Sequence, residues 1–251
     1  MQALTAEQVL RIWERGEGRS ANERAALLFA CARPEAPPSV LASATLGERE
    51  SELLELRIRT FGRRLESIDV CPACGTKVEI VIDADDLLSR NRGPAAAQRA
   101  GEHRLDLQLE DGGWRIVFRL PTGADLAALE SCEPARAPML LLERCVMSAD
   151  SADGPVSAGQ LPDEVQARVA AAMGELDPAA DITIVMSCPA CLREWQVCLD
   201  VGAFVWSELA AHARQLLWEV HELAERYGWS ESEIIRMSAH RRRAYRERIW
   251  E

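Results

Sequence analysis

Long apolar runs and lysine are both scarce in this chain of 251 residues, and its 29 basic residues are outnumbered by 40 acidic ones. No stretch approaches the ~20 apolar residues of a membrane-spanning helix, so we expect neither such a helix nor a membrane partner. The N-terminal segment lacks a basic start followed by an apolar run, so we expect no secretory signal and a cytoplasmic location. Lys77 is the only lysine and the formal net charge is −11. This disfavours non-specific nucleic-acid binding, because phosphates require a basic face.

The chain also lacks the motifs that usually mark an enzyme. It contains no G-x-S-x-G nucleophile motif, no phosphate-binding loop and no dinucleotide-binding glycine pattern. Its four histidines stand neither at metal-ligand spacing nor beside a nucleophile in a triad arrangement. We therefore predict that the protein is not an enzyme and has no catalytic residues.

The composition is that of a globular protein, with 48% hydrophobic and 27% charged residues. The apolar spacing is helical at both ends and strand-like in places between them, which predicts an α+β fold. Small polar residues predict loops at 89–102 and 148–160, and Asp111-Gly-Gly113 predicts a hairpin turn. Helices are predicted at 2–32 (two, capped by Thr5 and Ser20), 46–65, 124–129, 138–146, 162–176, 203–227 and 230–250, and strands at 78–82, 104–108, 114–120, 181–186 and 195–199.

The eight cysteines include two identical C-P-A-C tetrapeptides, which we call the first and second knuckles. A C-x-x-C turn places two thiolates at similar distances from one point, so it supplies half of a tetrahedral zinc site. Two knuckles supply four thiolates and leave no ligand position for water. The pattern therefore predicts one structural Zn²⁺, bound by Cys71, Cys74, Cys188 and Cys191.

The segments after the two knuckles are similar as well. When the knuckles are aligned, residues 78–83 (VEIVID) fall on residues 195–200 (WQVCLD), and Leu87-Leu88 falls on Phe204-Val205. Each half reads knuckle, strand, aspartate and helix start. This internal repeat predicts two β-hairpins that clasp one ion. The aspartates are predicted to end each strand or cap the next helix rather than to bind metal.

The separation of the knuckles is unusual, since 113 residues lie between Cys74 and Cys188. Zinc ribbons usually hold their knuckles about 15–20 residues apart. The sequence therefore predicts helical N- and C-terminal regions around a split Cys₄ zinc ribbon, with a mixed α/β insertion between the knuckles. The predicted parts are residues 1–66 (N-terminal helices), 67–90 plus 181–201 (split ribbon), 91–180 (insertion with a β-hairpin and helices) and 202–251 (C-terminal helices).

Three other uses of the C-x-x-C pairs stay open at this point. Redox chemistry, including a redox-active chaperone, is disfavoured because a strand rather than a helix follows each knuckle. Two disulfides are disfavoured by the missing secretory signal. Catalytic zinc is disfavoured because four thiolates leave no place for substrate. The remaining cysteines are expected to be buried core thiols, namely Cys31, Cys132, Cys145 and Cys198.

The C-terminal region has two features that fit partner binding. Trp206 and Trp218 lie on a long, bulky apolar helix face, and aromatic residues anchor many interfaces. Arg241, Arg242 and Arg243 belong to an arginine-rich tail that could dock an acidic partner. The alternative for the tryptophans is the protein core, and for the arginines a solvated helix face. We take the five residues as candidate partner-binding residues.

The chain resembles a family of zinc-ribbon proteins of contractile phage tails and phage-derived contractile injection systems, described as baseplate proteins or baseplate hub assembly chaperones. The resemblance covers most of the chain and keeps the order of the motifs. The motifs are Leu46-Gly-Glu-Arg-Glu50, Thr60-Phe-Gly-Arg63, Cys71-Pro-Ala-Cys-Gly75, Phe118-Arg-Leu-Pro-Thr122, Leu141-Leu-Glu-Arg-Cys145, Cys188-Pro-Ala-Cys191, Phe204-Val-Trp206-Ser-Glu208 and Tyr227-Gly-Trp-Ser230.

The resemblance implies a non-enzymatic, protein-binding role. Its expected partners are other baseplate or tail proteins, and the protein is expected in the cytoplasm or incorporated into a tail-like particle. The sequence leaves open whether it is a permanent subunit or a transient chaperone, and it does not give the oligomeric state. The alternative function is a zinc-ribbon nucleic-acid-binding protein or transcription regulator, which the arginine-rich tail favours and the net charge disfavours.

Overall fold

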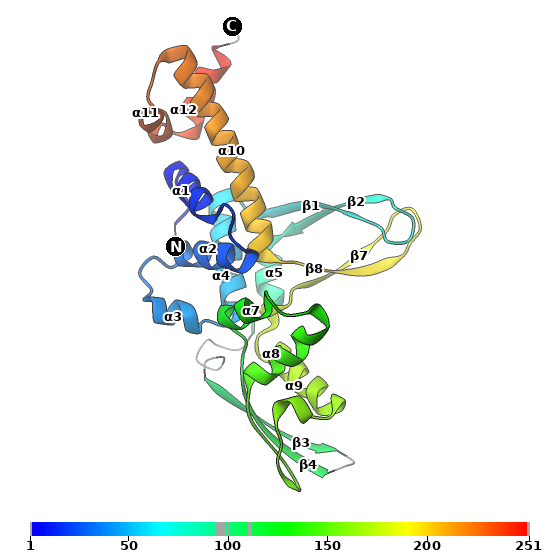
Figure 1. Cartoon of the computed structure of the whole chain (residues 1–251). Coiled ribbons are helices and arrows are strands. Elements are labelled where there is room, and N and C mark those ends of the chain that lie inside the picture. The colour runs from blue at the N-terminus through cyan, green and yellow to red at the C-terminus, as the bar shows by residue number, and fades with distance from the viewer. Residues whose placement is uncertain (1, 94–98, 100, 110–111, 250–251) are drawn as a thin grey trace.

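The computed structural model describes residues 2–93, 99, 101–109 and 112–249. The chain forms a mixed α+β fold, as the sequence predicts. A helical body lies at the centre, an arm of two β-hairpins projects from one side, and a lobe of strands and helices lies below (Figure 1). One long helix runs from the base of the arm past the body to the C-terminal helices (Figure 1).

The helical body is built from both ends of the chain. Thr5 and Ser20 start its first two helices as predicted, each in a capping box with the residue three positions later. Leu28, Leu53 and Leu209 come from three different helices and are fully buried in the shared core. The helices are α1 (Ala6–Gly16), α2 (Ala21–Ala32), α3 (Pro38–Ser43), α4 (Leu46–Phe61), α10 (Val201–Tyr227), α11 (Glu231–Arg236) and α12 (Ala239–Glu247).

The arm consists of two antiparallel hairpins. Strands β1 (Arg64–Val70) and β2 (Lys77–Asp83) form the first, and β7 (Thr183–Ser187) and β8 (Glu194–Cys198) form the second. Side chains alternate between the two faces of a strand, so one face of each hairpin can pack against the other hairpin. The facing side chains form a small core of Val78 and Met186 with the partly buried Ile80, Ile184, Trp195 and Val197.

The segment between the hairpins forms a lobe with its own core. Ile116 and Phe118 of its sheet are buried against Val165 and Val169 of helix α9. The sheet order is β3-β4-β5-β6, and every neighbouring pair is antiparallel. The elements of the lobe are β3 (Glu102–Leu109), β4 (Gly112–Arg119), α7 (Gly123–Leu129), α8 (Ala137–Cys145), β5 (Val146–Ser151), β6 (Gly154–Pro155) and α9 (Asp163–Leu176). Helix α5 (Ala84–Arg90) directly follows the first hairpin and packs into the core of the helical body beside α4.

Buried polar contacts dock the lobe onto the helical body. The carboxylate of Asp177, which follows α9, accepts a 2.8 Å hydrogen bond from the backbone N–H of Gly47 at the start of α4. A Cβ atom at position 47 would lie 2.2 Å from Asp177 Oδ1, so this approach requires glycine. Asn22 donates to the carbonyl of Gly123 at 2.9 Å and accepts from Arg49 at 2.7 Å.

Several predicted boundaries are wrong. The helix predicted at 46–65 ends at Phe61, because Gly62 adopts a φ of 96° and residues from Arg64 onward pair with β2. The helix predicted at 230–250 is divided at 237–238, where Ser238 caps α12. The loop predicted at 148–160 contains β6 and most of β5. Parts of the predicted loop 89–102 (94–98 and 100) and of the predicted turn (Asp111) lie outside the described residues.

Candidate metal centre

The two knuckles form the turns at the ends of the two hairpins. In the first, the N–H of Cys71 donates to the carbonyl of Thr76 at 2.9 Å, and the N–H of Gly75 donates to the carbonyl of Cys71 at 3.0 Å. The second repeats both bonds, from Cys188 to the carbonyl five residues on and from Leu192 back to Cys188, each at 2.9 Å. The internal repeat in the sequence is therefore also a repeat in backbone structure.

One position in this repeated turn needs a left-handed backbone. Gly75 has a φ of 73° in the first knuckle, and Leu192 occupies the corresponding position in the second with a φ of 60°. Leu192 is the only described non-glycine residue with positive φ. A left-handed L-residue costs about 1–2 kcal/mol, since its Cβ approaches the following carbonyl oxygen.

We expect Leu192→Gly to stabilise the arm. Glycine removes the steric cost but adds about 0.5–1 kcal/mol of backbone entropy in the unfolded chain. The expected net gain is about 0.5–1 kcal/mol in the free energy of unfolding, measured by denaturant titration. Leu192→Ala is the matched control, because it also removes the exposed side chain but keeps the strained backbone. Equal stability of the two variants would contradict strain at this position.

The four knuckle cysteines lie together, so the predicted ligand set is brought into one place. Their Sγ atoms all lie within 4.8 Å of one another. Cys71 Sγ is 3.7 Å from Cys191 Sγ, and Cys74 Sγ is 3.6 Å from Cys188 Sγ. A disulfide would place two sulfur atoms about 2.05 Å apart, so these are four free thiols. The cluster could hold a metal ion.

The cluster lies partly inside and partly outside the small core of the arm. Cys71 and Cys188 are buried, whereas Cys74 and Cys191 face solvent. On the core side, Trp195 Nε1 of β8 donates a 2.9 Å hydrogen bond to Asp69 Oδ2 of β1. This bond joins the two hairpins independently of the cysteines, and no sequence motif pairs the two positions.

The electrostatics of the cluster favour a cation. Hydrogen bonding to Thr76 lowers the pKa of Cys74 to about 6. Hydrogen bonding to the backbone of Arg193 lowers the pKa of Cys191, but the neighbouring sulfurs of Cys74, Cys71 and Cys188 outweigh this and raise it to about 12. The first thiolate of the cluster therefore forms readily, whereas ionising a second thiol beside it costs free energy. A bound dication would offset this repulsion and allow all four sulfurs to ionise.

The aspartates that end the repeat are helix caps, as predicted. Asp83 accepts a 2.9 Å hydrogen bond from the N–H of Asp85 and starts α5. Asp200 accepts a 2.8 Å hydrogen bond from the N–H of Ala203 and starts α10. Each hairpin therefore leads directly into a helix, and only two residues separate β8 from the long α10.

Trp206 is not available as a partner-binding residue, which corrects the sequence-based assignment. Its side chain is buried against α1 and α2, with 8% of the residue exposed. The guanidinium carbon of Arg24 lies 4.7 Å from the centroid of its ring. A Cβ atom at Gly16 would lie 2.3 Å from the same ring, so Trp206 and the glycine pack as a pair. Trp206 is a core residue.

The arginine cluster is divided in the same way. Arg242 is buried, donates a 2.8 Å hydrogen bond from Nε to Glu219 of α10 and donates to the carbonyl of Met237. It therefore holds α12 against α10 rather than facing a partner. Arg241 and Arg243 are exposed, as is Trp218. These three of the five candidate partner-binding residues therefore lie on the surface.

The other cysteines are less uniformly buried than expected. Cys145 is buried, Cys31 and Cys132 are partly buried, and Cys198 is exposed on the outer face of β8 with its Sγ 3.4 Å from Asp181 Oδ1. The expectation for Cys198 is wrong, because position 198 alternates with the inward-facing Val197.

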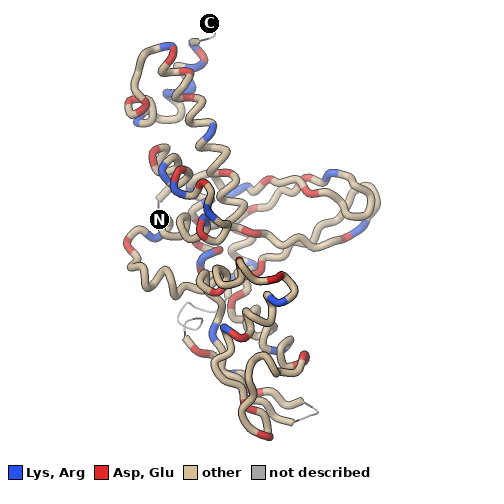
Figure 2. Tube along the Cα trace, viewed as in Figure 1, with Lys and Arg blue, Asp and Glu red and all other residues tan. Residues whose placement is uncertain are grey.

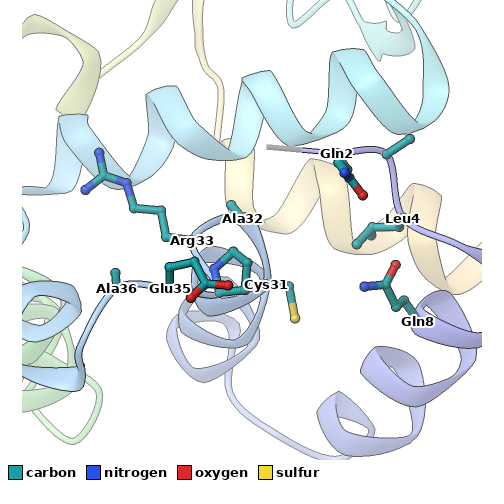
Figure 3. A pocket seen from close by; sticks show the side chains of 10 residues that line it. Gln2, Leu4, Gln8, Cys31, Ala32, Arg33, Glu35 and Ala36 are labelled. Atoms are coloured by element: carbon teal, nitrogen blue, oxygen red, sulfur yellow. The ribbon is translucent and has the colours of Figure 1, made fainter.

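A pocket near the N-terminus is lined by residues of α1, α2 and their flanking segments (Figure 3). Cys31 lines it, and burial raises the pKa of this thiol, which disfavours the reactive thiolate. Arg33 extends away from Cys31 toward α4 (Figure 3), where it pairs with Glu48 and Glu52 at 2.7 Å each. We assign no chemistry to this pocket.

Comparison of the chain with protein-family models, curated proteins and solved structures finds no match. Among the described residues, no helix combines the length and the apolar character needed to cross a bilayer.

Proposed function

We propose that Cys71, Cys74, Cys188 and Cys191 bind one structural Zn²⁺ and make the arm a split zinc ribbon. Four tetrahedral ligands at about 2.3 Å from zinc stand about 3.8 Å apart. Two of the sulfur pairs, at 3.6 and 3.7 Å, fit this spacing. The set is also chemically complete, because four thiolates fill the coordination sphere and give a tightly held, non-catalytic ion.

The proposed zinc has a mechanical role. It ties the two hairpins at their far ends, beyond the small core and the Trp195–Asp69 hydrogen bond that also join them. It also closes the chain around the inserted lobe, and β8 leads directly through Asp200 into α10. Metal binding therefore fixes the direction in which the chain enters the longest helix of the molecule.

We propose further that the protein is a non-enzymatic component or assembly chaperone of a contractile tail baseplate, acting by protein–protein binding. The observation that carries this proposal is the paired C-P-A-C cluster on a projecting arm, within the ordered set of motifs that resembles the baseplate family. The face for a tail protein is assigned to Arg241 and Arg243 on α12, whose positive charges suit an acidic partner.

The experiment is proteomic analysis of purified tail particles and of their assembly intermediates. A component is expected in both, whereas a chaperone is expected in the intermediates alone. Absence from both would contradict the proposal. The nucleic-acid alternative makes a different prediction: a tight complex with DNA or RNA whose affinity falls steeply with salt. Figure 2 shows acidic and basic residues interspersed along the body, arm and lobe, which disfavours the nucleic-acid alternative, because phosphates require a basic face.

We expect Arg241→Glu/Arg243→Glu to lower the amount of protein recovered with the intermediates by about tenfold at low salt, because rim charges mainly set association rates. The matched control is Arg136→Glu/Arg168→Glu, which makes the same charge change on exposed helical positions of the lobe. Equal losses in the two variants would show that net charge, rather than the α12 surface, controls recovery.

A further inference from the structure

One face of α10 is exposed over three helical turns and carries a largely exposed tryptophan. Arg214, Trp218, His221 and Glu225 follow one another at helical spacing, and all four are exposed. Trp218 is 66% exposed, and Leu217 beside it is 37% exposed. A shallow hollow lies between Arg214, Leu217, Trp218 and His221. The opposite face of the same helix is fully buried at Leu216 and Leu223, so this stripe is a surface separate from the core.

The charges on this stripe are ordered along the helix. Arg214 lies at the N-terminal end of the stripe and forms no ion pair with another described residue. Glu225 lies at the C-terminal end of the stripe, with a carboxylate oxygen 3.8 Å from Nε2 of His221. The ring of His221 also packs edge-on against Trp218, with centroids 6.0 Å apart. The stripe is therefore an aromatic pair between a positive and a negative end.

We propose that this face binds the same face of a second copy of the chain, with the two α10 helices antiparallel. When a two-fold axis passes between positions 219 and 220, Arg214 faces Glu225 of the second copy. The same axis places Trp218 opposite His221 of the second copy. Both pairs share this one midpoint, so a single register satisfies the charges and the aromatic rings. A parallel pair would instead place each charge against its own like charge.

The register also suits the tryptophans. At 1.5 Å per residue, the two Trp218 side chains would stand about 4.5 Å apart along the helices, close enough to contact across the axis. Each ion pair would lie about 8 Å to one side of that axis. A stripe of this length makes a small interface, so we expect a weak, concentration-dependent dimer. The inference goes beyond the proposed function, because it involves neither the metal nor a tail protein.

The test is sedimentation equilibrium of the full chain over ~1 to ~500 μM. The wild type is expected to shift from its monomer mass of 27.8 kDa toward twice that value. Trp218→Ala is expected to weaken association at least tenfold. Arg214→Glu and Glu225→Arg are each expected to weaken it, and the double variant Arg214→Glu/Glu225→Arg to restore it.

The charge exchange is diagnostic because positions 214 and 225 lie about 16 Å apart along one helix and cannot pair within a chain. Rescue in the double variant therefore requires contact between copies. Met147→Ala on β5 is the matched control, since Met147 is 54% exposed and lies on the lobe. A chain that stays monomeric throughout, a dimer unaffected by Trp218→Ala, or a double variant without recovery would each overturn the proposal. Metal content reports separately on the zinc site.

Discussion

Replacing Cys188 with serine is expected to release the proposed Zn²⁺ and unfold the arm. Cys188 is fully buried, and its Sγ lies 3.6 Å from that of Cys74 within the four-thiol cluster. A serine hydroxyl is not ionised at neutral pH, so three thiolates remain. Structural zinc sites contribute apparent binding free energies of about 10–16 kcal/mol, comparable to the stability of a whole domain. Metal content per chain and hydrogen exchange of both hairpins measure the effect.

Cys198→Ser is the control for this variant. Cys198 lies on the same hairpin but outside the cluster. The Cys198→Ser protein should therefore retain one metal ion per chain and normal exchange protection. A Cys188→Ser protein that keeps full metal content and a protected arm would contradict the proposed zinc site.

The second large effect is expected in the inserted lobe, on replacing Asp125 with asparagine. The Asp125 carboxylate is fully buried and accepts hydrogen bonds from Arg119 at 2.6 and 2.8 Å and from Arg144 at 2.9 Å. The N–H of Thr122 also donates to it, at 2.9 Å. Removing one partner of a buried ion network costs about 3–5 kcal/mol, because the remaining charges lose their partner. Denaturant unfolding of the full chain measures this loss.

The same interaction predicts a pH dependence. Burial alone raises the pKa of Asp125, but hydrogen bonds from Arg119 and Thr122 outweigh it and hold the pKa well below 3.8. A carboxyl with a lower pKa in the folded state stabilises the protein above its unfolded-state pKa. This contribution is lost as the pH falls below that value toward the folded-state pKa. The stability difference between wild type and Asp125→Asn should therefore narrow below about pH 4.

Asp153→Asn is the matched control, because Asp153 is exposed on the same lobe. It should change stability little at any pH. An Asp125→Asn protein as stable as this control at neutral pH would show that the buried network contributes nothing.

The cysteine cluster and its flanking helix caps could be predicted because their signals are local and repeated. A knuckle fixes the geometry of its own cysteines, and its second copy identified the missing half of the site. Asp83 and Asp200 were predictable for the same reason, since each follows a strand and precedes an apolar helix start. Strand β1 was missed because Leu65 continues the apolar spacing of α4, although β7, its counterpart in the repeat, was predicted.

The roles of the two tryptophans could not be predicted, because they depend on which helices cover α10. Positions 206 and 218 are twelve residues apart, so they point about 120° away from each other around the helix. α1 and α2 cover the face of Trp206, whereas Trp218 remains outside. Arg242 is buried, unlike Arg241 and Arg243, because it pairs with Glu219 of α10. Glu219 is 23 residues away in the sequence, so no local pattern predicts this contact.

The shared core of the first and last helices has a consequence for synthesis on the ribosome. α10 packs against α1, α2 and α4, yet 139 residues separate Phe61 at the end of α4 from Val201 at the start of α10. At about 5–20 residues per second, the ribosome needs about 7–28 s to translate them. Throughout this delay the nascent N-terminal helices expose the apolar faces that carry Leu28 and Leu53. The speed of translation through the insertion therefore sets how long the nascent chain is prone to aggregate through these faces.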